Sequence, residues 1–196
     1  MNTLKAEKRD MTIKARKLRR EGFVTGCIFG RELAESIPLK MEKASVDRLL
    51  KTEGKGGQVM LDVDGTTYNA LIKEVDFNPL KGTIDEIDFQ VLVSGEKVHS
   101  TAEIHLVNHE KLAAGVAQQM LHEVSFKALP AALVDKIQID IGDMKVGDTL
   151  KVKDLDIANN NEIVLTTDPE DVVVTITEVH GATASEDGAE GEAAAE

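Results

Sequence analysis

The chain has 196 residues, of which 42% are hydrophobic, and its formal net charge is −12. This amount of apolar material suits two modest cores better than one large doubly wound enzyme domain, so we expect two domains. The acidic average taken alone argues against a nucleic-acid partner. No stretch approaches the roughly 20 apolar residues of a membrane span, and the N-terminal residues lack the apolar segment of a signal peptide. We therefore expect a cytoplasmic protein.

The first half of the chain is predicted to form a compact β domain with short helices. Strands are expected at residues 4–9, 23–29, 36–41, 58–63, 66–76 and 84–93, and helices at 12–21 and from the N-cap Ser45 onward. Gly22 suits the left-handed position after a helix, and Pro38 favours an edge position for its strand. Asp64-Gly65 is the preferred two-residue hairpin turn. The domain is predicted to span residues 1–94.

The second half is predicted to be another β domain, at residues 95–181. Apolar residues alternate with polar ones over 98–106, and further short runs at 124–129, 136–141, 149–152, 162–165 and 171–179 are separated by turn residues. Residues 182–196 contain no aromatic or large aliphatic side chain, so we expect a disordered acidic tail. The predicted fold class is therefore mostly β with short helices (α+β).

Basic residues gather at one end of the chain. Residues 1–31 hold nine basic residues against three acidic ones, a net charge of +6, so the remainder sums to −18. This distribution predicts one cationic patch on an otherwise anionic particle. Between residues 97 and 180 there are seven lysines and fourteen acidic residues, so we expect no second polyanion site there.

Three arginines form the core of the cationic patch. On a helix, Arg16, Arg19 and Arg20 stand at i, i+3 and i+4 and share one face. Guanidinium groups at fixed spacing can each direct two donors to phosphate oxygens or a guanine edge. A solvated helix face is the ordinary interpretation of such a segment. Here the patch is arginine-rich and lies in an acidic protein, which favours phosphate binding.

Other motifs carry little chemistry. Cys27 lies in an apolar run and is predicted to be a reduced core thiol, with a catalytic thiol as the minor alternative. His105 and His109 have the spacing of a helical metal pair but follow a strand pattern. The turn at 54–57 lacks the remaining residues of a P-loop and is predicted to be flexible. We therefore predict no catalytic residue, metal or cofactor, and no enzyme activity.

Several segments of the first half together resemble large-subunit ribosomal protein L twenty-five. They are Arg16–Val24, Cys27–Gly30, Ile72–Val75, Asn78–Lys81 and Ile87–Phe89. The two-domain length and acidic tail are similar to the longer form of that family, the general stress protein Ctc type. The resemblance covers residues 1 to about 180, with specific motifs in the first 93. It implies a small N-terminal β-barrel that binds the loop E region of 5S ribosomal RNA, followed by a C-terminal β domain.

The resemblance also implies which residues contact RNA. Arg9, Arg16, Lys17 and Arg19 match basic RNA-contacting positions of the family, and Asp88 matches an acidic position beside the RNA face. An aspartate there can accept hydrogen bonds from base amino groups. A structural, capping role for that aspartate is equally open. We expect recognition of phosphates and of a wide minor groove. The predicted RNA-binding residues are Arg9, Arg16, Lys17, Arg19, Arg20, Lys73 and Asp88.

The chain departs from the family pattern at several positions near this patch. Thr25-Gly26 stands where a proline is usual, Phe29 replaces a tyrosine, Glu86 replaces a histidine, and Phe77-Asn78 and Thr12-Ile13 replace polar and basic residues. A carboxylate near phosphate opposes binding. We therefore expect a reduced affinity for RNA or a shifted contact.

Three functional hypotheses follow. The preferred one is a structural component of the large ribosomal subunit that binds 5S ribosomal RNA, with its acidic domain and tail facing away from RNA. The C-terminal domain then contacts neighbouring ribosomal proteins, and neither a membrane nor DNA is expected as a partner. The alternative is a stress-related protein-interaction module whose ribosome association is weak or conditional. A catalytic β domain is the third hypothesis, and no residues support it.

Overall fold

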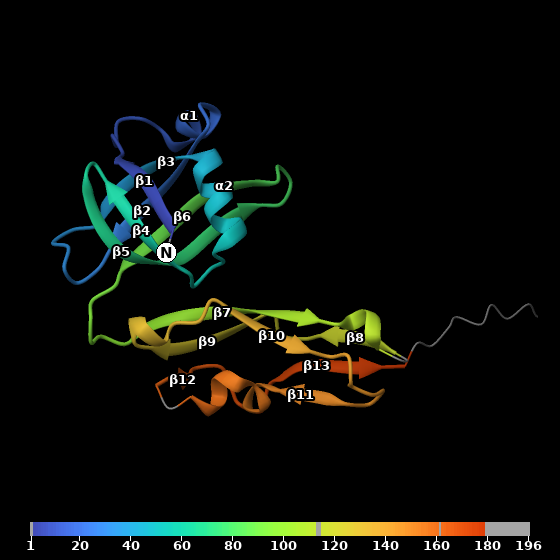
Figure 1. Ribbon diagram of the computed structural model, residues 1–196. Helices are drawn as coiled ribbons and strands as arrows, with labels where there is room; N and C mark the ends of the chain where they lie inside the picture. The colour runs from blue at the N-terminus through green and yellow to red at the C-terminus, as the bar shows by residue number, and fades with distance from the viewer. Residues whose placement is uncertain (1, 113–114, 161, 179–196) are drawn as a thin grey trace, which may run out of the picture.

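The computed structural model describes residues 2–112, 115–160 and 162–178 of the chain. Figure 1 shows a barrel, formed by β1 to β6, stacked above a two-layered sandwich formed by β7 to β13. The predicted fold class, mostly β with short helices, is confirmed. The tail predicted to be disordered lies outside the described residues.

The barrel closes in the strand order β1-β3-β2-β6-β5-β4. Its strands are β1 (Asn2–Lys8), β2 (Phe23–Phe29), β3 (Ile37–Glu42), β4 (Gln58–Val63), β5 (Thr66–Asn78) and β6 (Thr83–Val91). The pairs β1–β4 and β2–β6 are parallel, and the other pairs are antiparallel. The edge position predicted for Pro38 was wrong, because β3 pairs with both β1 and β2. Its carbonyl accepts a hydrogen bond from the Arg9 amide at 2.9 Å.

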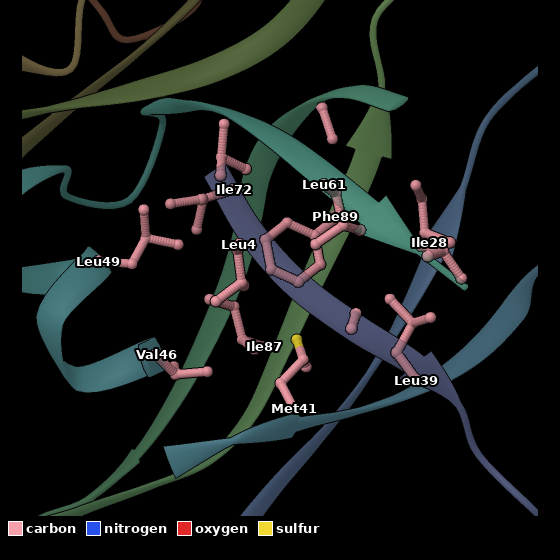
Figure 2. Packing of buried hydrophobic residues seen from close by; sticks show 14 of the residues in the cluster. Leu4, Ile28, Leu39, Met41, Val46, Leu49, Leu61, Ile72, Ile87 and Phe89 are labelled. Carbon is pink, nitrogen blue, oxygen red and sulfur yellow. The ribbon is translucent and has the colours of Figure 1, made fainter. Parts of the chain in front are cut away.

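Side chains at alternate strand positions fill the barrel. Figure 2 shows Phe89 in the middle of the cluster, surrounded by Leu4, Ile28 and Leu61 from other strands. Helix α2 (Lys43–Thr52) adds side chains from its buried face to the same core. The helix begins at Lys43 with Glu42 at the N-cap, so the predicted cap at Ser45 was wrong. The hydroxyl of Ser45 instead donates to Glu42 Oε2 at 3.2 Å.

The parallel strands β2 and β6 approach unusually closely at Gly26. A Cβ atom built there would lie 1.8 Å from the carbonyl oxygen of Ile87, closer than any two such atoms can come. Only glycine fits at this position. The Thr25-Gly26 departure from the family's proline pattern therefore lies where the backbones of β2 and β6 are in close contact.

Helix α1 (Ala15–Arg20) is shorter than the predicted helix over 12–21. A turn occupies the preceding residues, in which Asp10 Oδ1 accepts hydrogen bonds from the amide and hydroxyl of Thr12 at 2.8 and 2.7 Å. These hydrogen bonds lower the pKa of Asp10. Because the Asp10 side chain gives this backbone an alternative to helix, the helix starts three residues later. Gly22 has φ +90°, as predicted.

The sandwich consists of two sheets with a shared core. One sheet has the order β10-β7-β9-β12 and the other β11-β13-β8. Phe126, Ile141 and Ile176 are among the fully buried residues between them. The strands are β7 (Val98–Val107), β8 (Val116–Gln119), β9 (Glu123–Ala128), β10 (Lys136–Asp140), β11 (Thr149–Lys151), β12 (Val164–Leu165) and β13 (Val172–Thr177). Short 3-10 helices lie at His109–Lys111, Pro130–Ala132, Val152–Asp154 and Asp156–Asn159.

An exposed ion-pair network joins two segments of the sandwich. Glu170 accepts hydrogen bonds from Lys151 and Lys153, each at 2.8 Å. The two lysines lower the pKa of Glu170 to about 2. The network links the end of β11 to the turn before β13.

Candidate nucleic-acid interface

Helix α1 presents two arginines to solvent. Leu18 is buried and fixes the helix to the barrel, while Arg16 and Arg20 are exposed one turn apart. Within the part of the chain that the structure describes, neither arginine forms an ion pair or a side-chain hydrogen bond. Lys17 is also exposed, with its Nζ 3.9 Å from Glu21 Oε1. An exposed pair at this distance contributes little, so Lys17 can also turn toward an anion.

Arg19 points in a different direction, over the outer face of the barrel. Its Nε donates to the carbonyl oxygen of Asp85 at 3.0 Å, and its terminal nitrogens lie 3.9 Å from Asp85 Oδ2 and 3.8 Å from Glu86 Oε2. The side chain is one-third exposed. Arg19 is therefore held in place by two acidic neighbours, unlike Arg16 and Arg20.

Arg9 lies at the end of β1, behind the turn that leads to α1. Its Nη2 donates to the carbonyl oxygen of Ile13 at 3.2 Å, and its buried Nε has no hydrogen-bond partner among the described residues. The side chain is only partly exposed. Its observed contact thus supports the turn before the arginine helix.

A strip of carboxylates covers the outer face of β5 and β6. Asp88 pairs across the strands with Glu74, and Glu86 pairs with Asp76. All four residues alternate with core residues such as Ile87, so their side chains point out of the barrel. Like charges directly opposite each other destabilise a sheet. We call these four residues the carboxylate strip.

Asp88 has a structural contact as well as an outward position. Its Oδ1 accepts a hydrogen bond from the backbone amide of Cys27 at 2.9 Å. Burial, followed by the nearby carboxylates of Asp88 and Glu86, raises the pKa of the Cys27 thiol to about 12. Cys27 itself is half-buried on the outer face of β2, so the prediction of a core thiol was wrong: the alternation of the strand directs Val24, Gly26 and Ile28 inward.

Lys73 lies apart from the arginines. It occupies an irregularity in the pairing of β5 with β6, and its Nζ donates to the carbonyl oxygen of His99 in the sandwich at 2.8 Å. Burial, and then repulsion from Lys55, lower the pKa of Lys73. The fold therefore gathers Arg16, Lys17 and Arg20 on α1 and places Lys73 at the junction with the sandwich.

The sequence interpretation did not single out Glu74 and Asp76. Their alternation with Val75 was a usable signal, because it placed both carboxylates on the outward side of a strand. No group of three or more histidine, cysteine, aspartate or glutamate side chains suited to a metal ion occurs among the described residues. None of the helices described is long and apolar enough to cross a membrane.

Comparisons with known proteins match both halves of the chain. The profile of the Ribosomal L25p family matches residues 4–89, and that of the C-terminal domain of ribosomal protein TL5 matches residues 97–180. Large ribosomal subunit protein bL25 of Thermoanaerobacter sp. is 33% identical over 177 residues, which cover 89% of this chain and 87% of that protein. The protein of the same name from Bacillus velezensis is 33% identical over 180 residues, which cover 90% of this chain and 88% of that protein. That from Listeria monocytogenes is 30% identical over 178 residues, with 89% and 84% covered.

Proposed function

Because the chain belongs to the ribosomal L25p family, a family of ribosomal structural proteins rather than enzymes, we propose that it binds 5S ribosomal RNA in the large ribosomal subunit. Residues 1–94 form the RNA-binding unit in this proposal. The exposed pair of Arg16 and Arg20 carries it, since two guanidinium groups without acidic partners among the described residues stand beside an outward sheet face.

The helix and the sheet face have different tasks in this mechanism. Arg16, Lys17 and Arg20 bind phosphates, which supplies affinity and orientation but little sequence information. Asp88, Glu74 and Asp76 of the carboxylate strip can only accept hydrogen bonds when ionised, whereas Glu86 is engaged by Arg19. A strip of acceptors selects donors, and base amino groups in a wide minor groove are the donors that RNA offers there. Phosphates therefore lie over α1, and base edges lie over the strip.

Arg19 and Arg9 support this surface from behind. Arg19 is tied to Asp85 and Glu86 and lies between the cations of α1 and the strip. Arg19 can donate hydrogen bonds to RNA only if its guanidinium group separates from Asp85 and Glu86. Arg9 holds the turn before α1. We expect Arg9 to act mainly through the position of the helix.

The test is the affinity of the full chain for 5S ribosomal RNA against an unrelated structured RNA, measured by fluorescence anisotropy at several salt concentrations. The Arg16→Gln/Arg20→Gln variant should bind more weakly, and the slope of log affinity against log salt should flatten by about 0.7 to 0.9 for each lost phosphate contact. The Lys111→Gln/Lys145→Gln variant removes the same charge from exposed positions of the sandwich and serves as the control.

Absence of selectivity for 5S ribosomal RNA in the unmodified chain would contradict the proposal. So would equal losses in the two variants, because the arginines would then act through net charge alone. An association with ribosomes that survives ribonuclease treatment would support the protein-interaction alternative instead.

A further inference from the structure

The barrel and the sandwich are packed against each other. Leu71, Leu92 and Val98 form a small buried cluster where they meet. Polar contacts also cross the junction: Lys136 Nζ donates to the carbonyl oxygen of Thr52 at 2.9 Å. Side chains of the two halves can therefore form one continuous surface.

The turn at residues 54–57 rests directly on β7. Gly54, Gly56 and Gly57, in the turn predicted to be flexible, are buried. Gly56 has φ +86°, and a Cβ atom there would lie 2.0 Å from the carbonyl oxygen of Thr101. This close backbone contact leaves no room for a side chain. The turn fixes where the barrel sits on the sandwich.

Two adjoining clefts open at this junction, and both are lined by Lys73 and His99. The first has a volume of about 560 Å³ and is also lined by Phe29 and Gln90 from the outer face of the barrel and by Lys97. The second has a volume of about 490 Å³ and lies between β5, β7 and β9. The clefts therefore lie beside Lys73 of the barrel and Lys97 at the start of the sandwich.

Positive charge accumulates around these clefts. His99 pairs across the strands with Lys127, which stands beside the clefts without lining them, and Lys97 precedes His99 by two residues. Desolvation by neighbouring groups, followed by repulsion from Lys127 and Lys73, lowers the pKa of the exposed His99. Within the described part of the chain, Lys73, Lys97 and Lys127 form no ion pair. Cations crowded in this way are stabilised by an anion placed among them.

Acidic residues lie in and beside the clefts, and two of them are already engaged in ion pairs. Glu96 lies 3.1 Å from Arg31, and Glu123 lies 3.1 Å from Lys55. Glu74 of the carboxylate strip lines the second cleft and partly offsets the charge of Lys73. The excess of cations is therefore greatest around Lys97 and Lys127.

An unpartnered hydroxyl lines the second cleft. Ser100 is only 5% exposed, and its Oγ has no hydrogen-bond partner among the described residues. A buried polar atom without a partner costs free energy unless a ligand or water completes it. This Oγ exposes less than 1 Å² and lies on the face of β7 opposite His99, so the phosphate contacts come from the lysines and His99 and not from Ser100.

The outer face of β2 and β6 runs from α1 at one end of the barrel to the two clefts at the other end. Figure 1 shows α1 at the end of the barrel remote from the sandwich, and β2 runs from that end to Phe29, at the first cleft. The six steps from Phe23 to Phe29 span about 20 Å at roughly 3.3 Å per residue. A nucleic-acid strand places several phosphates over this length. Cations therefore stand at both ends of a carboxylate strip.

We propose that the junction of Lys73, Lys97, His99 and Lys127 is a second phosphate site for the same RNA that binds α1. The inference rests on the proposed function and extends it. RNA is anchored by phosphates at both ends of the barrel face, while base edges lie over the carboxylate strip between them. One end of the acidic sandwich then faces RNA, although its overall charge predicted no polyanion site.

The test compares the full chain with its Lys97→Gln/Lys127→Gln variant, in which both replaced side chains are exposed. The salt slope for 5S ribosomal RNA should flatten by about 1.4 to 1.8 for the two lost phosphate contacts. Hydroxyl-radical footprinting should lose one protected stretch of RNA, distinct from the stretch lost with Arg16→Gln/Arg20→Gln. The Lys111→Gln/Lys145→Gln variant is again the matched control.

The outcomes separate the two proposals. If the unmodified chain binds RNA selectively and only the arginine variant is impaired, the junction site is wrong and the function stands. If the unmodified chain shows no selectivity, both proposals are wrong. A flattened slope with the loss of a second footprint supports the junction site.

Discussion

The carboxylate of Glu86 should weaken RNA binding, and its replacement by glutamine should strengthen it. Glu86 lies 3.8 Å from Arg19 Nη2 and is about half exposed. It belongs to the carboxylate strip and stands where the family usually has a histidine. The Glu86→Gln change keeps the shape of the side chain and removes its charge. It thereby frees Arg19 from one of its acidic neighbours.

The size of the effect follows from two electrostatic contributions. A phosphate about 7 Å from the carboxylate is repelled by roughly 0.6 kcal/mol in bulk water and by about 2.4 kcal/mol at an effective dielectric constant of about 20. Salt at about 0.1 M roughly halves these figures. The contact with Arg19 is partly exposed and contributes at most about 1 kcal/mol. We expect a total of about 1 kcal/mol, a roughly fivefold lower Kd.

Anisotropy titrations with 5S ribosomal RNA at several salt concentrations measure this change. Because the gain is electrostatic, it should shrink as salt rises. Glu110→Gln, at an exposed position of the sandwich, is the control for net charge. An unchanged Kd for Glu86→Gln, or a gain no larger than that of the control, would refute the reasoning.

Three further predictions concern the remaining features. The pKa of Cys27, about 12 against an ordinary 9.0, predicts alkylation about a thousandfold slower than for a free thiol at pH 8; Asp88→Asn should accelerate it, and an unchanged rate would exclude the carboxylate as a cause. Gly26→Ala should lower the free energy of unfolding by about 3 kcal/mol in urea titrations, against about 1 kcal/mol for Gly95→Ala, where nothing lies within 4 Å of the added carbon; equal losses would contradict the close contact. The pKa of Glu170, about 2, predicts that its ion pairs stabilise the sandwich above the ordinary value of 4.5 and lose this effect as pH falls toward 2. Glu170→Gln should therefore lower the urea midpoint at pH 7 and lower it progressively less as the pH falls from 4.5 through 2, and a pH-independent difference would contradict the assignment.

Local signals predicted much of the fold. The bounds of β2 match the predicted strand, and Asp64-Gly65 forms the expected hairpin turn with φ values of +51° and +90°. Both signals depend on a few neighbouring residues, so they predict the local structure without knowledge of the tertiary contacts. The period-two pattern after Val98 likewise became β7, with Ala102 and Ile104 in the core of the sandwich.

Other features depend on contacts between distant segments, which periodicity does not specify. The interior position of Pro38 follows from barrel closure, in which its strand gains a partner on each side. The four-residue β8 is too short to produce a strong pattern and was not predicted. The short 3-10 helices of the sandwich were missed for the same reason.

The candidate interface was predictable in composition but not in geometry. The arginine cluster was visible from charge alone, yet Arg16 and Arg20 face solvent while Arg19 is held by Asp85 and Glu86. These partners are 66 and 67 positions away in the chain, so only the fold brings them together. The direction of Lys73 toward the sandwich depends in the same way on how the two halves pack.

The parallel pairs that close the barrel also constrain how it can be synthesised. Strand β1 finds its partner in β4 and β2 finds its partner in β6, each more than fifty residues later in the chain. A nascent chain released only as far as β5 therefore carries open strand edges, which are prone to pair with other chains. Such long-range pairing also slows folding, because the entropy of loop closure is lost before the stabilising contacts form. Release of β6 is thus the event that converts an aggregation-prone intermediate into a barrel without edges, before the strands of the sandwich can pair with one another.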